Sequence, residues 1–121
     1  VTWLVDYVTP EGITKLMQIA LDNGYTAIAS ELCYALPSSD ISRFGKLAYD
    51  NDNIAVFSEL LDWLDYDDVK ALAERAYTDD HIAYFSLMAD GLYEEVLEVY
   101  LNRAVSDGKT AFAAVIRERL D

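Results

Sequence analysis

Residues 49–76 read YDNDNIAVFSELLDWLDYDDVKALAERA, and the next segment of equal length, residues 77–104, reads YTDDHIAYFSLMADGLYEEVLEVYLNRA. Ten of the 28 aligned positions are identical, whereas ordinary residue usage would give about two. Residues 21–48 align in the same frame, with nine identities to residues 49–76. A fixed period of this length indicates a repeat architecture.

The repeat continues to both ends of the 121-residue chain, because Ala20 falls in the same column as Ala48, Ala76 and Ala104. Ala111 likewise falls in the column of Ala27, Ala55 and Ala83. The sequence therefore predicts a single helical-repeat domain over residues 1–121. Its repeats are residues 1–20 (partial), 21–48, 49–76, 77–104 and 105–121 (partial).

Each repeat has the pattern of two short helices. In residues 53–64, for example, Val56, Phe57 and Leu60 recur at helical spacing, and Asp67 is placed to cap the helix that follows, as Asp40 is one repeat earlier. No alternating pattern typical of strands competes with these helices. We expect an all-α fold, an α-solenoid of stacked antiparallel helical hairpins with nine short helices: residues 2–8, 11–20, 25–36, 40–48, 53–64, 67–76, 81–90, 92–104 and 109–120.

The loops between repeats end at equivalent positions, Gly24, Asp52, Asp80 and Gly108. Glycine at two of these positions favours a left-handed backbone there, since glycine adopts positive φ without steric cost. Aspartate at the other two weakens that inference.

Two repeat starts, GYTAI at residues 24–28 and DGKTAF at residues 107–112, resemble the opening of an ankyrin repeat. The period of 28 residues is shorter than the ankyrin period of about 33. Ala29 and Ala113 stand where the ankyrin repeat usually has histidine. The resemblance implies an ankyrin-like helix stack with shortened loops and a role in protein binding.

Composition excludes several function classes. The net charge of −13 and the pI of about 4.2 argue against direct binding to nucleic acid or to an anionic membrane, both of which require a basic surface. Because 53% of the residues are hydrophobic, the chain is not a disordered acidic tail. Residues 50–98 contain fourteen acids and two bases, so nearly all of the charge belongs to the two central repeats.

In a linear stack, equivalent positions of successive repeats lie side by side, so these acids would form rows that attract a basic partner. Aromatic residues interleaved with them would serve as binding anchors. The alternative is that the acids only complement helix dipoles and keep the protein soluble. The predicted partner-binding residues are Asp50, Asp52, Glu59, Asp62, Trp63, Asp65, Tyr66, Asp67, Asp68, Asp79, Asp80, Asp90, Glu94 and Glu95.

No motif indicates catalysis. Cys33 is the only cysteine and is expected to be a small buried residue on a helix; His81 is the only histidine and is expected at a helix start in a capping or surface role. The aspartate runs that begin at Asp50 and Asp65 lack the glycine and final glutamate of a calcium loop. We therefore expect no enzyme activity, no cofactor and no metal. Residues 1–8 match neither a signal peptide nor a membrane span, and we expect a cytoplasmic protein.

The leading hypothesis is a non-enzymatic protein-binding module whose acidic central repeats engage a partner with a basic surface. A sharper version is a nucleic-acid mimic that inhibits a DNA- or RNA-binding enzyme, as small acidic phage anti-defence proteins do. The alternative is a generic ankyrin-like scaffold, or a fragment of a longer solenoid that mediates protein–protein interaction. The oligomeric state stays open.

Overall fold

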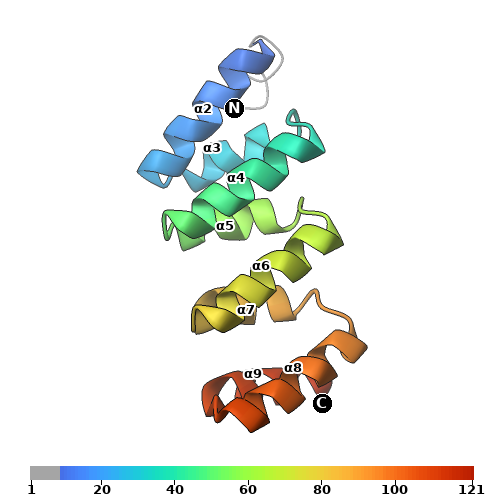
Figure 1. Cartoon of the computed structure of the whole chain (residues 1–121). Helices are drawn as coiled ribbons and strands as arrows, with labels where there is room; N and C mark the ends of the chain where they lie inside the picture. The colour runs from blue at the N-terminus through green and yellow to red at the C-terminus, as the bar shows by residue number, and fades with distance from the viewer. Residues whose placement is uncertain (1–8) are drawn as a thin grey trace. The chain divides into compact units, whose positions relative to one another are not determined.

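The computed structural model describes residues 9–121, which form eight α-helices and contain no β-strand (Figure 1). The predicted all-α class is therefore confirmed for these residues. The predicted helix over residues 2–8 lies outside the described part of the chain. The chain divides into two compact units, residues 1–65 (unit 1) and residues 66–121 (unit 2), and each is considered by itself.

Each unit contributes four of these helices. In unit 1 they are α2 (Pro10–Asn23), α3 (Thr26–Leu32), α4 (Ser38–Asp50) and α5 (Ile54–Leu61). In unit 2 they are α6 (Tyr66–Thr78), α7 (Ile82–Ala89), α8 (Glu94–Asp107) and α9 (Thr110–Leu120).

The helices pack as hairpins in two layers. In unit 1, α2 packs on α3 and α4 packs on α5, while α3 contacts α5 and α2 contacts α4. In unit 2, α6 packs on α7, α8 packs on α9, and α7 contacts α9. The predicted hairpins, which paired residues 25–36 with residues 40–48, were wrong because the pairing is shifted by one helix. The closely packed partners are instead the helices joined by the tight loops at Gly24, Asp52, Asp80 and Gly108.

One backbone motif closes all four of these loops. At each loop the amide of the residue after the turn donates to the carbonyl of the alanine five residues earlier, at 2.8–2.9 Å: Tyr25 to Ala20, Asn53 to Ala48, His81 to Ala76 and Lys109 to Ala104. A bond of this span around a left-handed residue is the Schellman motif, which satisfies carbonyls left open at a helix end.

The left-handed residue is present in every copy of the motif. Its φ is 70° at Gly24 and 74° at Gly108, and it is also positive at the two aspartates, 56° at Asp52 and 61° at Asp80. The expectation that aspartate would weaken the left-handed inference was wrong, because its short polar side chain tolerates this conformation. The backbone therefore repeats with the same period as the sequence, even where the side chain at the turn differs.

Gly24→Ala is expected to lower the free energy of unfolding by about 1 kcal/mol, because a Cβ in the left-handed region crowds the following carbonyl oxygen. An added Cβ at Gly24 would meet no other atom within 4 Å, so the cost comes from the backbone alone. Gly91→Ala is the matched control, since Gly91 is not among the residues with positive φ and its Cβ would lie an ordinary 3.7 Å from the Met88 carbonyl oxygen. Urea unfolding followed by circular dichroism measures both; equal effects of the two substitutions would contradict the prediction.

The helices that follow the tight loops are shorter than predicted. The predicted segments 25–36 and 53–64 are helical only over α3 and α5, and residues 81–90 only over α7. Each of these helices ends in a turn in which a backbone amide donates to the carbonyl three residues earlier: Ala35 to Leu32, Trp63 to Leu60 and Gly91 to Met88. The other helices are longer than predicted at their carboxyl ends, because the Schellman loops extend them.

The predicted capping roles of Asp40 and Asp67 were also wrong. Pro37 is the N-cap of α4, and Asp40 lies inside the first turn of that helix. Asp67 likewise follows Tyr66, the first residue of α6. Pro37 can take the cap position because its extended backbone precedes the helix and its missing amide is not needed there. The two aspartates instead stabilise the helices through the helix dipole.

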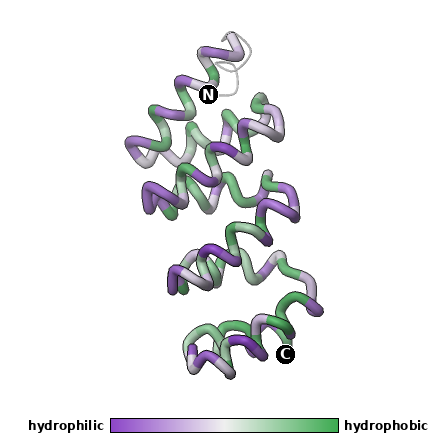
Figure 2. The backbone as a smooth tube through the Cα atoms, in the orientation of Figure 1, coloured by the Kyte–Doolittle hydropathy of each residue, from purple (hydrophilic) through white to green (hydrophobic). Residues whose placement is uncertain are grey.

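The alanine column lies in the core. Ala20, Ala48, Ala76 and Ala104 are all fully buried, which a close approach of neighbouring helices requires. In unit 2 the core around them is aromatic: the rings of Tyr77, Phe85, Tyr100 and Phe112 have centroids 5.2–6.2 Å apart. The longer helices α2, α4, α6 and α8 contain both hydrophobic and hydrophilic residues (Figure 2), as burial of only one side requires.

Candidate functional site

The fourteen predicted partner-binding residues divide between the two units, and none of them is buried. Unit 1 holds Asp50, Asp52, Glu59, Asp62, Trp63 and Asp65; unit 2 holds Tyr66, Asp67, Asp68, Asp79, Asp80, Asp90, Glu94 and Glu95. Unit 1 has ten acids and three bases, a net charge of −7, and unit 2 has twelve acids and six bases, a net charge of −6. The acidic character therefore belongs to both units.

Within unit 1 five of the six predicted residues lie near the two ends of α5. Asp50 and Asp52 are in or beside the loop that precedes this helix, and Asp62, Trp63 and Asp65 follow it. Tyr34 lies next to the residues that follow α5, because its ring meets the Trp63 ring edge-on, with centroids 4.7 Å apart. The Tyr34 side chain is 74% exposed.

Glu59 faces a different environment on α5. It is half-buried, and its charge adds to burial in raising the pKa of the Cys33 thiol to about 11, with burial the larger cause. Cys33 itself is buried, as the sequence predicted, but it is the C-cap residue directly after α3 and not a residue of the helix. A thiol with a raised pKa is a poor nucleophile at neutral pH.

Within unit 2 the structure brings the starts of α6 and α8 together. The Tyr66 and Tyr93 rings stack with centroids 4.1 Å apart, and the Tyr93 amide donates to the Tyr66 hydroxyl at 3.0 Å. Four predicted acids lie on the first turns of these two helices: Asp67 and Asp68 on α6, and Glu94 and Glu95 on α8. We call these six residues the tyrosine-pair site. Tyr93 is the member that the predicted set omitted.

The remaining predicted acids of unit 2 lie elsewhere and take part in ion pairs or loops. Asp79 and Asp80 follow α6, at the opposite end of that helix from Asp67. Asp80 pairs with Lys109 at 2.8 Å, and Asp90 pairs with Arg119 at 2.9 Å. Arg119 also donates to the carbonyl and hydroxyl of Ser86, so this pair ties α9 to α7.

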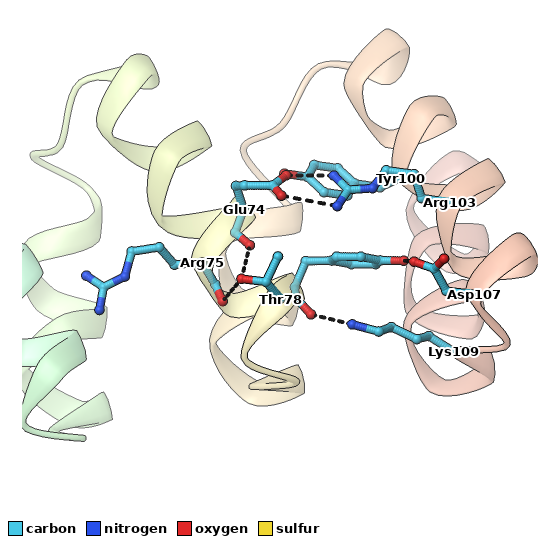
Figure 3. Close-up of polar contacts among 8 residues, drawn as sticks. Glu74, Arg75, Thr78, Tyr100, Arg103, Asp107 and Lys109 are labelled. Atoms are coloured by element: carbon cyan, nitrogen blue, oxygen red, sulfur yellow. Dashed lines mark hydrogen bonds and ion pairs between the residues drawn. The ribbon is translucent and has the colours of Figure 1, made fainter.

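A polar cluster that the sequence analysis did not predict connects α6 to α8 and α9 (Figure 3). Arg103 donates to both carboxylate oxygens of Glu74, at 2.7 and 3.1 Å, and the Tyr100 hydroxyl donates to the same carboxylate at 2.8 Å. We call Glu74, Tyr77, Tyr100, Arg103, Asp107 and Lys109 the Glu74–Arg103 cluster. Its only signal in the sequence was the repeated Arg75/Arg103 and Tyr49/Tyr77 columns.

Tyr77 lies at the centre of this cluster. Its hydroxyl donates to Asp107 at 2.6 Å, and its carbonyl accepts from the Lys109 ammonium at 2.7 Å. The Arg103 guanidinium lies 4.5 Å from the centroid of the Tyr77 ring and 5.3 Å from that of Tyr100. One arginine thus lies beside two neighbouring tyrosine rings and is bound by a bidentate carboxylate, an arrangement suited to its planar shape.

These contacts shift the pKa values of the cluster. Hydrogen bonds from Arg103 hold the pKa of the Glu74 carboxyl below its ordinary value, and a bond from Tyr100 acts in the same direction. Burial, followed by the hydrogen bond to Asp107, raises the pKa of the Tyr77 hydroxyl to about 12. Burial and the bond to Glu74 raise the pKa of Tyr100 still further. The cluster is therefore fully charged at Glu74 and neutral at both tyrosines near pH 7.

Glu74→Gln is expected to lower the free energy of unfolding at neutral pH by up to about 1 kcal/mol, the value of an exposed ion pair of good geometry. The folded-state pKa of Glu74 is depressed, so its contribution is present above the ordinary value of 4.5 and is lost as pH falls through the folded value. The difference between wild type and variant should therefore shrink at acidic pH. Urea unfolding across this range measures it, with Glu98→Gln on the exposed side of α8 as the control; a pH-independent difference would refute the assignment.

The structure also places the single histidine of the sequence. His81 is the exposed N-cap residue of α7, where its side chain makes no capping hydrogen bond, and its ring lies 5.9 Å from that of Tyr84. Among residues 9–121, no group of three or more His, Cys, Asp and Glu side chains is arranged to hold a metal ion. In the same range, no helix has the length and apolar character needed to cross a membrane.

Comparison with known proteins adds no further assignment: a scan against protein-family models, a search of curated proteins and a search of solved structures each return no match.

Proposed function

We propose that the chain is a non-enzymatic protein-binding module whose exposed acids engage a partner with a basic surface. The observation that carries the proposal is the contrast between acids and bases in unit 2. Three of the six bases of unit 2, Arg103, Lys109 and Arg119, are engaged in ion pairs with the protein's own acids, whereas Asp67, Glu94 and Glu95 are exposed at helix starts, near an exposed tyrosine. Such a surface has a negative potential that accelerates and orients binding of a cationic partner.

A sharper form of the proposal is a nucleic-acid mimic. If the repeats continue as an ankyrin-like α-solenoid, the acids of residues 49–104 form rows that replace phosphates in the binding groove of a DNA- or RNA-binding enzyme. The recurrence of a left-handed residue in each of the four tight loops supports the 28-residue repeat on which this form of the proposal depends. We place the protein in the cytoplasm, where a reducing environment suits its single buried thiol.

The test is capture of proteins from a lysate on the immobilised full chain at low and at moderate salt. The charge-reduced variant is Asp62→Asn, Asp65→Asn and Asp67→Asn; Asp90 is left intact because it pairs with Arg119. The control variant, Glu11→Gln, Asp22→Asn and Asp121→Asn, removes the same charge from other exposed positions. We expect basic proteins to be retained at low salt, released as salt screens the charges, and bound about tenfold more weakly by the charge-reduced variant alone, at roughly 0.5 kcal/mol per charge.

Double-stranded DNA distinguishes the mimic from other acidic binders. The chain itself should not bind DNA, but DNA should compete for the captured protein when the acids occupy its nucleic-acid groove. Retention that neither salt nor the charge-reduced variant changes would overturn the proposal.

The second candidate is a generic scaffold that binds through apolar contacts. The observation in its favour is the set of exposed large apolar side chains, among which Tyr34 is 74%, Tyr93 is 62% and Val99 is 58% exposed. A scaffold of this kind would retain its partner at high salt, so the salt series separates the two functions.

A further inference from the structure

Unit 2 contains an arginine site that its own chain fills. In the Glu74–Arg103 cluster, one guanidinium lies beside two neighbouring tyrosine rings, and a carboxylate accepts two of its hydrogen bonds. Both cations are attracted to an aromatic face, but only the planar guanidinium can stack on it and donate two parallel hydrogen bonds to one carboxylate.

The tyrosine-pair site presents the same chemical groups without an arginine. Each ring of the stacked pair covers one face of the other, at 4.1 Å between centroids and 23° between planes. The Lys70 ammonium lies 5.6 Å from the centroid of the Tyr66 ring, so this pair already attracts a cation. Tyr93 is 62% exposed, and the carboxylates next to it in sequence, Glu94 and Glu95, are exposed as well.

The arrangement favours a cation over an anion. Helix starts ordinarily attract anions, but the starts of α6 and α8 already have the protein's own acids on their first turns. The Tyr93 amide is also engaged, because it donates to the Tyr66 hydroxyl. The groups left to meet a ligand are therefore the exposed face of the Tyr93 ring and the neighbouring carboxylates.

We propose that the exposed face of Tyr93, together with Glu94 and Glu95, binds an arginine side chain of a basic protein partner. This inference rests on the proposed function and deepens it, since it names the residue type that the partner presents. The guanidinium stacks on the ring while its amino groups donate to the carboxylates, as Arg103 does with Tyr77, Tyr100 and Glu74. A lysine at the same place loses the stacking and the bidentate bonds.

The experiment measures binding of two soluble peptides, one rich in arginine and one rich in lysine, with identical length, spacing and net charge. Calorimetry at low salt gives the Kd of each for the full-length chain and its variants. We expect the arginine peptide to bind more tightly, and Tyr93→Ala to weaken it by about five- to thirtyfold while changing the lysine peptide much less. Tyr93→Phe, which keeps the ring face, should retain the preference.

Two matched variants exclude general effects. Tyr25→Ala removes another exposed tyrosine from a helix start and should change neither Kd, and Glu94→Gln with Glu95→Gln should weaken the arginine peptide more than Glu11→Gln with Asp22→Asn. Equal binding of the two peptides, or no effect of Tyr93→Ala, would overturn the arginine site while the acidic-surface function stands. If the wild type binds neither peptide at low salt, the proposed function falls as well.

Discussion

Tyr77→Ala is expected to lower the free energy of unfolding by about 3–5 kcal/mol, the range for removal of a large aromatic side chain from a packed core. Tyr77 is 1% exposed, and its ring contacts those of Phe85, Tyr100 and Phe112. Alanine would leave a cavity among these rings. It would also remove the ring face that the Lys109 ammonium approaches to 4.1 Å.

Tyr77→Phe separates the hydroxyl from the ring. It retains the packing and loses only the hydrogen bond to Asp107, so we expect a cost of about 1 kcal/mol. Tyr25→Ala, at a position where the side chain is 48% exposed, serves as the control for loss of an aromatic residue from the surface. Chemical unfolding of the full-length variants provides the comparison, and a loss for Tyr77→Ala no larger than that for Tyr77→Phe would show that the ring does not organise this core.

Asn53→Ala is expected to cost about 2–3 kcal/mol, because one side chain makes two separate contributions in unit 1. Its amide oxygen accepts from the Val56 amide and caps α5, an interaction that contributes about 1 kcal/mol. Its amide nitrogen donates to the carbonyl of Leu21, at the end of α2, and leaving that half-buried acceptor without a partner costs a further 1–2 kcal/mol, roughly.

Asn53→Ser separates the contribution of the helix cap from that of the hydrogen bond to Leu21. Serine keeps an oxygen that can cap α5 but cannot reach Leu21, so its stability should fall between those of the wild type and Asn53→Ala. Equal stability of the serine variant and the wild type would show that the bond to Leu21 contributes nothing. Lys109 occupies the equivalent position in unit 2, where its ammonium donates to the carbonyl of Tyr77. Lys109→Ala therefore tests whether this long-range bond matters in both units.

The repeat period predicted the helical class and the order of the helices, because each apolar column recurs at the same place in the core. It did not predict the packing partners. A break such as the one at Pro37 and a tight loop such as the one at Gly24 both read as turns in the sequence, and only the structure shows which one closes a hairpin. The left-handed backbone at Asp52 and Asp80 was likewise hidden, since aspartate is compatible with several conformations.

The exposure of the predicted acids followed from the sequence, but their grouping did not. Tyr66 and Tyr93 fall in different columns of the repeat, so alignment gave no reason to join them. Glu74 and Arg103 also belong to different columns, and the positions one repeat earlier hold Lys46 and Arg75, so no repeated acid–base pattern marked the pair. Contacts between columns depend on how neighbouring helices are offset, which periodicity alone does not specify.

The four Schellman loops have a consequence for how such a chain can change length. Because Gly24, Asp52, Asp80 and Gly108 share one backbone conformation at equal intervals, exchange of genetic material between any two of them would join compatible ends. One repeat could be lost or duplicated, made of the second helix of one hairpin and the first helix of the next, and the backbone conformation of the loop at the junction would be kept. A change in length by one complete repeat would therefore disturb the loops less than the insertion of a few residues would disturb a helix.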